Sequence, residues 1–411
     1  MTERPPLLMI PGPVEVSPGV LAALSVAPPS HNAPALIEAF GSALAAMRQI
    51  WSAGPAAQPF VVAGGGTLAM EMAVGNLVAP GDPVVVVNTG YFSDRLTEML
   101  RRQGAVPLEV SAEVGDAPTE QKVREILFTH RRAGPWRALF ATHVDTSTGV
   151  RIDPEPLARL AREHGMVSVF DGVCATAGER FDMAGWDADV YLTAGQKALG
   201  LPPGLAMMVV SERALAARAS HRGRGPALYL DWERWRPVML AYEERRPSYF
   251  STPATNLILA LAAGLREILD EGLAARIARH ERAAAALRQA WDVLDLAPVP
   301  VRPELAANTL SALLFPAGVD GSLVARVLAH GVMVAGGLHP AIKDSYFRIG
   351  HMGYAVSRPD LLRRTVEAVA VSLRDAGRAV DPRRALAPLD ALEGQQTAAP
   401  AARRRAAKSS S

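Results

Sequence analysis

VYLTAGQKALGLPPG, residues 190–204, is the stretch that decides the fold, and Lys197 lies at its centre. The apolar run before this lysine is typical of a buried β-strand, and Pro202, Pro203 and Gly204 form a rigid turn after it. Lysine side chains are usually exposed to solvent. A lysine at the end of a buried strand can instead lose its proton by desolvation and attack a carbonyl. Lys197 is therefore a candidate for Schiff-base chemistry, and a surface lysine is the alternative.

Short apolar runs elsewhere in the sequence also end in polar side chains. They are residues 84–87 before Asn88, residues 138–142 before His143, residues 167–170 before Asp171, and residues 190–193 before Gln196 and Lys197. Continuous apolar runs between amphipathic segments predict an α/β fold, with parallel strands covered by helices on both faces. Ligands of such doubly wound sheets bind at the carboxyl ends of the strands. We therefore expect these polar side chains to line one crevice.

A lysine and a carboxylate at neighbouring strand ends suit pyridoxal phosphate. This cofactor binds a lysine covalently and needs an acid beside its pyridine nitrogen. Lys197 and Asp171 would fill these two catalytic roles. Residues 63–71, AGGGTLAME, offer glycine amides before a helix whose N-terminus attracts a phosphate. Because the stretch lacks both the GxGxxG spacing and the P-loop lysine, it argues against a dinucleotide or P-loop site.

Several motifs together carry a resemblance to a known family. In chain order they are GGGTLAME, NTGYFSDR, THVDTSTGV, DGVCATAG, QKALGLPPG and FRIGHMG. From about Leu8 to about Ala376, the chain resembles the class V pyridoxal phosphate-dependent aminotransferases, and most of all the alanine:glyoxylate and serine:pyruvate or serine:glyoxylate enzymes. The resemblance implies a fold type I transferase. Its large domain would hold a mainly parallel, seven-stranded type of sheet covered by helices, followed by a smaller α+β C-terminal domain.

The resemblance also implies a phosphate site. Gly65, Gly66 and Thr67 would bind the cofactor phosphate, although many relatives have a serine where this chain has Gly65. Tyr249 and Thr252 would reach the phosphate of a partner subunit, which predicts a homodimer with shared active sites. A solvated surface connection is the alternative for the charged and aromatic region around these two residues.

Contacts to the cofactor ring follow from the same resemblance. Phe92 and Val173 would pack on opposite faces of the ring, while Thr146 and Gln196 would lie beside it. Relatives usually have a glutamate where this chain has Asp145. Aspartate is shorter by one methylene, so we expect its orienting hydrogen bond to need a water molecule or a shifted loop.

Arg348, in FRIGHMG, is the candidate ligand for the substrate carboxylate. An arginine within a strand needs a partner, and its planar fork matches a carboxylate with two hydrogen bonds. A structural ion pair is the alternative. Gly12, in the turn of residues 11–13, is a candidate substrate neighbour. No second arginine can be assigned to a side-chain carboxylate, although Arg95 and Arg245 are the first suspects.

The chain divides into four predicted parts. Residues 1–20 form an extended N-terminal segment, residues 21–268 the large cofactor-binding domain, and residues 269–376 the small domain, with strands near 309–315, 332–335 and 346–349. Residues 377–411 are rich in Ala, Pro and Arg, and this composition predicts a disordered tail.

Composition sets further bounds. With 49% hydrophobic and 20% charged residues and a net charge of +2, the chain gives no reason to expect a nucleic-acid or membrane partner. A single cysteine, Cys174, excludes an internal disulfide framework and suits a reducing compartment. Since Met1 is not followed by a basic and apolar leader, and no apolar run is long enough to span a membrane, the expected location is the cytoplasm.

These observations predict a transaminase that uses no metal. An amino group would move from alanine or serine to a 2-oxo acid, with glyoxylate as the expected acceptor, by a ping-pong mechanism through a Lys197 aldimine. Other functions on the same scaffold stay open: a lyase, a cysteine desulfurase-like enzyme, or an inactive regulator that binds the cofactor. A desulfurase is disfavoured because residues 273–376 contain no cysteine to attack the substrate sulfur.

Overall fold

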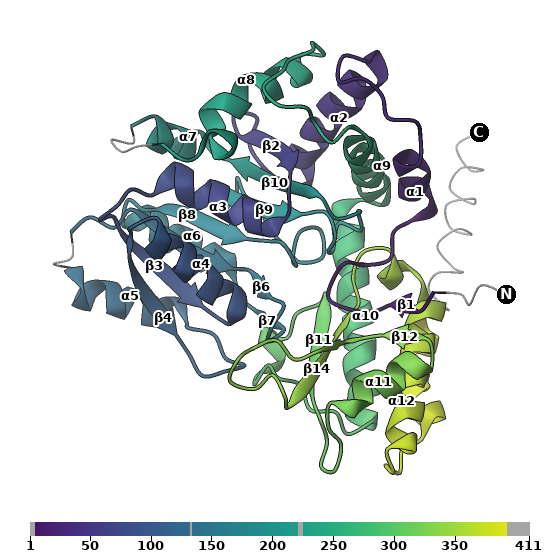
Figure 1. The fold of residues 1–411 in the computed structure, drawn as a ribbon. Helices are drawn as coiled ribbons and strands as arrows, with labels where there is room; N and C mark the ends of the chain where they lie inside the picture. Colours follow the sequence, from purple (N-terminus) through teal and green to yellow (C-terminus); the bar gives the residue numbers. More distant parts are fainter. Residues whose placement is uncertain (1–4, 132–133, 221–224, 393–411) are drawn as a thin grey trace, which may run out of the picture.

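The computed structural model describes residues 5–131, 134–220 and 225–392. Two main hydrophobic cores divide most of them into a large domain around a seven-stranded sheet and a small domain around a three-stranded sheet (Figure 1). The N-terminal segment, purple in Figure 1, begins in the small domain and then runs to helices beside the large one. Leu7 and Met9 of this segment are buried in the core of the small domain. The segment therefore ties the two domains together.

The large sheet has the strand order β2-β10-β9-β8-β5-β3-β4. β10 runs antiparallel to both its neighbours, and the remaining pairs are parallel. The bounds in chain order are β2 Gln58–Ala63, β3 Pro83–Asn88, β4 Val106–Ser111, β5 Ala138–Thr142, β8 Val167–Asp171, β9 Val190–Ala194 and β10 Leu205–Val210. Residues 84–87 of β3 are completely buried, as expected for strands covered on both faces. The parallel strands β3, β5, β8 and β9 bring their carboxyl ends to one edge.

Helices cover this sheet (Figure 1). Their bounds are α1 Pro18–Leu24, α2 Pro34–Ile50, α3 Gly66–Leu77, α4 Tyr91–Arg102, α5 Glu120–Thr129, α6 Pro154–Glu163, α7 Glu212–Ala219, α8 Trp232–Glu243 and α9 Thr255–Glu271. Local sequence explains several of their starts. Asp153 caps α6 by accepting a hydrogen bond from the Glu155 amide at 3.1 Å, and Pro154 supplies a preset backbone angle at the first position.

The small domain follows along α10, Leu273–Val293. Its strands are β11 Leu310–Leu314, β13 Ala335–Gly336 and β14 Tyr346–Gly350, with β14 between the other two. β1, Leu7–Leu8, pairs in parallel with β12, Val332–Met333, and α11 Ser322–Ala329 and α12 Pro359–Asp375 pack against each other. The structure also contains a small hairpin, β6 Val144–Asp145 and β7 Val150–Arg151, and the 3₁₀ turns Leu228–Leu230, Pro303–Leu305 and Ala355–Ser357.

Two predictions about the ends of the chain need correction. The N-terminal segment is extended only as far as Ser17, because the Ser17 hydroxyl accepts a hydrogen bond from the Val20 amide at 3.2 Å and starts α1. The prediction of a disordered tail is wrong for residues 382–392, which form a helix. Ala385 and Leu389 are completely buried on the small domain. The overall composition concealed their helical spacing of four residues, while residues 393–411 lie outside the described part.

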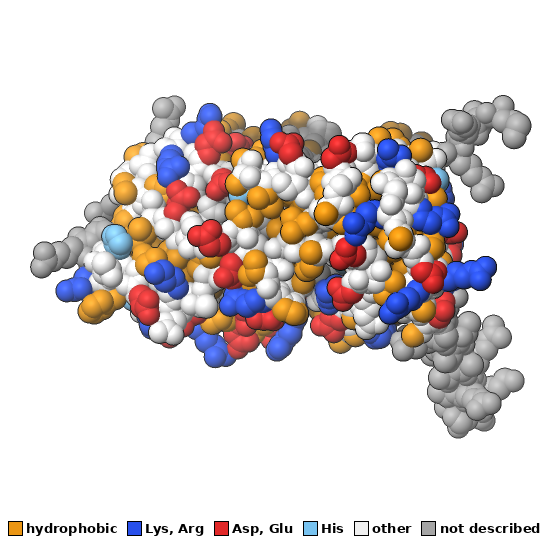
Figure 2. Space-filling model, turned by 90° about the horizontal axis from the view of Figure 1, so that it is seen from below, with side chains coloured by type: hydrophobic (Ala, Val, Ile, Leu, Met, Phe, Trp, Pro, Cys, Tyr) orange, Lys and Arg blue, Asp and Glu red, His pale blue; other side chains and the backbone are white. Residues whose placement is uncertain are grey.

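The charged region before α9 is only partly a surface connection. Within α8, Trp232 and Trp235 are buried in the large core, whereas Tyr249 and Thr252 further along are exposed. No helix in the described ranges is long and apolar enough to cross a membrane. On the face shown in Figure 2, acidic and basic side chains are intermixed, so this face carries no extended patch of one charge sign.

The buried position of Leu389 predicts that the last described helix stabilises the small domain. Leu389→Ala removes a fully buried side chain and should lower the free energy of unfolding by about 2–4 kcal/mol. The exposed Arg384 of the same helix is the control, and Arg384→Ala should change stability by less than about 0.5 kcal/mol. Urea denaturation followed by circular dichroism measures both. Equal, small effects would show that the helix does not pack on the domain.

Candidate active site

Lys197 lies in the tight turn after β9, where backbone hydrogen bonds fix its position. The Gly200 amide donates to the Lys197 carbonyl at 2.8 Å, and the Leu201 amide donates to the Gly195 carbonyl at 2.9 Å. The lysine side chain extends to the N-terminal segment, where Nζ donates a hydrogen bond to the Pro11 carbonyl. Lys197 is thus held both by its own turn and by a segment from the start of the chain.

Gly12 is required where the N-terminal segment approaches Lys197. Its φ angle is +100°, in the region that favours glycine. A Cβ atom at this position would lie 2.5 Å from Lys197 Cδ and 2.8 Å from the Gln196 carbonyl oxygen. A side chain here would therefore displace the lysine.

A cavity of about 250 Å³ opens at this edge of the sheet. Most of the predicted site residues line it together. They are Gly12, Gly66, Thr67, Phe92, Thr146, Asp171, Val173, Gln196 and Lys197. The structure thus gathers side chains from the ends of β8 and β9, the N-termini of α3 and α4, the loop after β6 and the N-terminal segment.

The surroundings of Lys197 favour the neutral form of its amine. Lys197 is partly buried, and desolvation lowers its pKa below the ordinary lysine value. The positive charge of Arg348 lowers this pKa further, while Cys174 and Asp171 oppose the shift. A neutral amine is the form that attacks a carbonyl or accepts a proton.

Asp171, the last residue of β8, presents its carboxylate to the same cavity. The Val173 amide donates a hydrogen bond to Oδ1 at 2.9 Å. Burial raises the pKa of Asp171 to about 6, against the lowering effects of that hydrogen bond, Lys197 and Arg95. A protonated pyridine nitrogen beside this carboxylate would favour its ionised form.

His143 lies behind Asp171 and does not line the cavity. Its amide donates to the Asp171 carbonyl at 2.9 Å, and its Nδ1 is 2.8 Å from the Tyr191 hydroxyl. Burial lowers the pKa of His143 to about 3, so the ring is neutral near pH 7. His143 therefore supports the Asp171 backbone without adding a charge.

Asp145 orients the start of α4 directly, while the expected need for a water molecule or a shifted loop stays a prediction. Its carboxylate accepts hydrogen bonds from the Phe92 amide at 3.1 Å and from the Ser147 hydroxyl at 2.6 Å. Gly90 makes this approach possible, because a Cβ there would lie 2.9 Å from Asp145 Cγ. The shorter side chain thus reaches the amide of Phe92, the predicted ring contact, and fixes its place.

Arg348, in the middle of β14, does not itself line the cavity but bonds from the small domain to Thr146, which does. Its Nε donates to the Gly336 carbonyl at 2.9 Å, and Nη1 donates to the Thr146 carbonyl at 3.0 Å. Within the described part of the chain it forms no ion pair, so the alternative of a structural salt bridge finds no support. Two carbonyl oxygens position the guanidinium while leaving its charge available to a carboxylate.

Arg95 lines the cavity at its other side, together with Thr67. Its Nη1 donates to Thr67 Oγ1 at 3.2 Å, and Nη2 donates to the Tyr91 hydroxyl at 3.1 Å. The guanidinium also lies over the rings of Tyr91 and Phe92, at 5.0 and 5.2 Å from their centroids. Arg245, the other suspected arginine, forms an ion pair with Glu38 and does not line the cavity.

Four predicted site residues are not among those lining the cavity, and Arg348 is one of them. Gly65 precedes α3 as its N-cap, and a Cβ there would meet no atom within 4 Å. Tyr249 is 64% exposed and Thr252 is also exposed, so neither reaches the cavity of its own chain. The sequence motifs did not identify Pro13, Met70, Val144 or Pro203, which also line the cavity. Apolar side chains of this kind carry no signal that separates a site wall from a core.

The residues of the cavity fit pyridoxal phosphate. Lys197 would hold its aldehyde carbon, Asp171 its pyridine nitrogen, and the N-terminus of α3 its phosphate. Gln196 Oε1 is buried and has no hydrogen-bond partner among the described residues, as expected of a group that awaits a ligand. No cluster of three His, Cys, Asp or Glu side chains that could hold a metal occurs in the described ranges.

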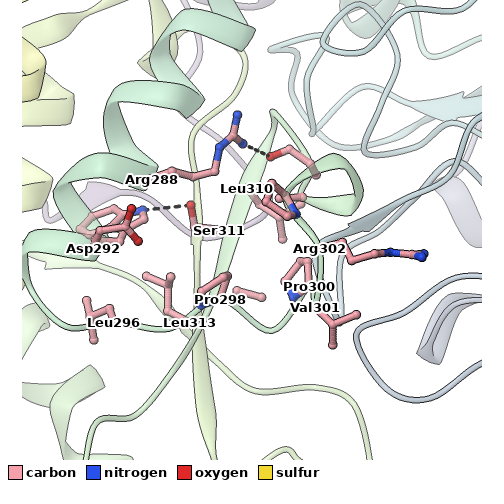
Figure 3. Close-up of a pocket in the computed structure, with 16 residues that line it drawn as sticks. Arg288, Asp292, Leu296, Pro298, Pro300, Val301, Arg302, Leu310, Ser311 and Leu313 are labelled. Carbon is pink, nitrogen blue, oxygen red and sulfur yellow. Dashed lines mark hydrogen bonds between the residues drawn. The ribbon is translucent and has the colours of Figure 1, made fainter.

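A second cavity, of about 340 Å³, lies between α10 and β11 and shares no lining residue with the first (Figure 3). Trp291 Nε1 donates to Ser311 Oγ at 3.0 Å beside it, and Arg288 donates to the Ala307 carbonyl at 3.3 Å. Its wall contains no lysine and is largely apolar, with Leu296 and several prolines. The lysine and carboxylate chemistry therefore belongs to the first cavity.

Comparison with known proteins agrees with this geometry. The profile of the family described as "Aminotransferase class-V" matches residues 31–359. The chain belongs to this family. It is 34% identical over 373 residues to alanine–glyoxylate aminotransferase 1 of Saccharomyces cerevisiae, covering 88% of this chain and 95% of that one. It is therefore a pyridoxal phosphate-dependent aminotransferase.

Two further relatives show the range of this family. L-Aspartate–glyoxylate aminotransferase of Paracoccus denitrificans is 33% identical over 356 residues, covering 86% of this chain and 87% of that one. The solved structure of alanine–glyoxylate aminotransferase from Nostoc sp. has a TM-score of 0.83 and 31% sequence identity, covering 91% of this chain and 97% of that one. The fold type predicted from the sequence is confirmed by this aminotransferase structure.

The raised pKa of Asp171 predicts how the cofactor-free protein responds to pH. Between about pH 4 and 6, Asp171 ionises in the unfolded chain but stays protonated in the folded one, so its contribution to stability falls as pH rises. Asp171→Asn removes this ionisation and should stabilise the cofactor-free protein by about 1–3 kcal/mol at pH 8, with little gain at pH 4. Urea denaturation at the two pH values measures the difference. The same gain at both would show that ionisation is not its cause.

Proposed function

We propose that this aminotransferase transfers an amino group from a small amino acid, alanine or serine, to glyoxylate. The observation that carries the proposal is the placement of Lys197 and Asp171 at one cavity of about 250 Å³, with Arg348 of the small domain bonded to the carbonyl of Thr146 in the cavity wall. One arginine suits the one carboxylate of a monocarboxylic substrate. The glyoxylate enzymes of yeast and Nostoc support the choice of acceptor.

The chain's own residues divide the work. Arg348 binds the substrate carboxylate, and Thr146 and Gly336 fix its fork through their carbonyl oxygens. Lys197 Nζ, whose pKa is lowered by desolvation, accepts the proton from the substrate α carbon and returns a proton on the other side of the transfer. Asp171 keeps a proton on the pyridine nitrogen. Bound pyridoxal phosphate supplies the electron sink for the carbanion that this proton removal leaves.

Aspartate is the strongest competing donor, because one relative is named an L-aspartate–glyoxylate aminotransferase. A dicarboxylic donor would need a second cation near the cavity. Arg245 is paired with Glu38, and Arg95 lies at the side of Thr67, where we expect the cofactor phosphate. This arrangement favours a small donor.

A panel of donors and acceptors tests the substrate assignment. Alanine, serine, glycine, aspartate and glutamate are each paired with glyoxylate, pyruvate and 2-oxoglutarate, and the release of the keto acid is followed. We expect the highest kcat/KM with alanine or serine and glyoxylate. Lys197→Ala is the control and should lower turnover by at least about 1000-fold, because it removes the base that moves the proton.

Different results of the panel lead to different conclusions. Aspartate or glutamate as the best donor would overturn the small-donor assignment and require a second cationic anchor. Sulfide release from cysteine without amino transfer would contradict the aminotransferase itself. The buried position of Cys174 disfavours that outcome, because burial raises the pKa of this thiol to about 11 and keeps it protonated near pH 7.

We further propose a homodimer with shared active sites. Tyr249 and Thr252 belong to the phosphate motif of the family by sequence, yet both are exposed and neither lines the cavity of its own chain. An aromatic side chain with 64% exposure suits a residue that a partner covers.

The buried, single Cys174 also supports a reducing location, for which the cytoplasm is our proposal.

Mixed dimers test the shared site. The Lys197→Ala variant and the double variant Tyr249→Phe/Thr252→Ala are each purified as homodimers, which should have little or no activity. The subunits of the two homodimers are then dissociated and mixed. If the sites are shared, one site of the mixed dimer collects both defects and the other collects neither, so activity per mixed dimer should recover to about half that of the wild type. Unrecovered activity, with mixed dimers shown by differently tagged subunits, would mean that these residues serve their own chain.

A further inference from the structure

Arg95 has no assigned role in the reaction, although it lines the catalytic cavity. It lies in the first turns of α4 and is held there by two neutral hydroxyls, Thr67 Oγ1 at 3.2 Å and the Tyr91 hydroxyl at 3.1 Å. Among the described residues it has no carboxylate partner. A guanidinium with neutral contacts only retains its full charge for an anion.

The surroundings of Arg95 point to one particular anion. Its hydrogen-bond partner Thr67 belongs to the first turn of α3, whose N-terminal amides carry a partial positive charge of about half a unit. A phosphate carries up to two negative charges, so those amides alone neutralise it incompletely. Gly65 offers no hydroxyl, and α3 has no acidic residue in its first turn that would compete for the arginine.

The charge of Arg95 also acts inside the cavity. Its positive charge lowers the pKa of the Asp171 carboxyl, which lines the same cavity. Its guanidinium packs over the ring of Phe92, the residue expected to stack on the cofactor. Asp145 fixes the backbone of Phe92 through a 3.1 Å hydrogen bond. The start of α4 is thus fixed in position, and it holds the Arg95 guanidinium in place.

We propose that Arg95 is a ligand of the cofactor phosphate, and that its guanidinium together with Thr67 and the N-terminus of α3 forms the phosphate site within each subunit. The side chain contributes the full positive charge that the glycine-rich turn lacks. Arg348 binds the substrate carboxylate from the small domain, so the two arginines select for the two anionic groups of the loaded site. Among the described residues that line the cavity, this division leaves no arginine for a second substrate carboxylate.

Cofactor binding with and without the phosphate tests this role. Apo enzyme is titrated with pyridoxal phosphate and with pyridoxal, which lacks only the phosphate, and protein fluorescence gives both Kd values. Arg95→Gln should weaken pyridoxal phosphate binding by about 10- to 100-fold, as expected for a charge-assisted hydrogen bond. Pyridoxal binding should change by less than about threefold. Arg95→Lys keeps the charge and should restore part of the loss.

The same helix provides the matched control. Arg102 is exposed on α4 and paired with Glu98 at 2.6 Å, so Arg102→Gln removes an equal charge outside the cavity. Its effect on both Kd values should be less than about twofold. Thermal unfolding of each apo variant shows whether it is folded. If Arg95→Gln does not fold, Arg95→Lys alone decides, because loss of the planar fork should still weaken pyridoxal phosphate binding more than pyridoxal binding.

Other outcomes overturn the proposal. Equal weakening of pyridoxal and pyridoxal phosphate by Arg95→Gln would mean that Arg95 only supports the packing of Phe92. An unchanged Kd for pyridoxal phosphate, with an increased KM for aspartate only, would make Arg95 a ligand of a substrate side-chain carboxylate. Neither result would depend on which small amino acid is the preferred donor.

Discussion

The burial of Lys197 and Asp171 at the carboxyl edge of the main sheet is the constraint on which the rest of the site depends. Charged groups lose hydration when they are buried, so burial favours a neutral lysine and a protonated carboxyl. The two shifts make Lys197 reactive and leave Asp171 in need of a positive partner. A cofactor with an aldehyde and a basic ring nitrogen suits both groups.

Maintaining that burial requires both domains. The N-terminal segment covers Lys197 and contributes Gly12, whose missing side chain lets the backbone approach the lysine. The same segment continues the small domain through β1, and β14 of that domain supplies Arg348. Arg348 in turn bonds to the carbonyl of Thr146 in the large domain. Arg348, the N-terminal segment over Lys197 and the loop that carries Thr146 are therefore connected through these contacts.

The two arginines of the site lie on different sides of the cavity. Arg95 and Arg348 lie at the Thr67 side and the Thr146 side, and each is oriented by neutral oxygen atoms. Neutral partners orient a guanidinium while leaving its charge available, whereas a carboxylate partner would neutralise it. Arg245 illustrates the contrast, since its ion pair with Glu38 stabilises the surface away from the cavity. An arginine whose partners are neutral oxygen atoms is thus available to a ligand, whereas an arginine paired with a carboxylate is structural.

The sequence by itself determined the α/β class, the cofactor and the two catalytic candidates, because buried parallel strands leave continuous apolar runs and their polar endings stand at fixed places after them. It could not predict the contact of Asp145 with the Phe92 amide or that of Arg95 with Thr67. Both contacts depend on how α3, α4 and the hairpin β6–β7 approach one another. The helix at residues 382–392 was missed for a similar reason: its composition is that of a solvated tail, and only the apolar surface of the small domain gives Leu389 a place to be buried. Local pattern therefore decided the elements and the chemistry, while packing between distant segments decided which charges face the site and which segments are folded.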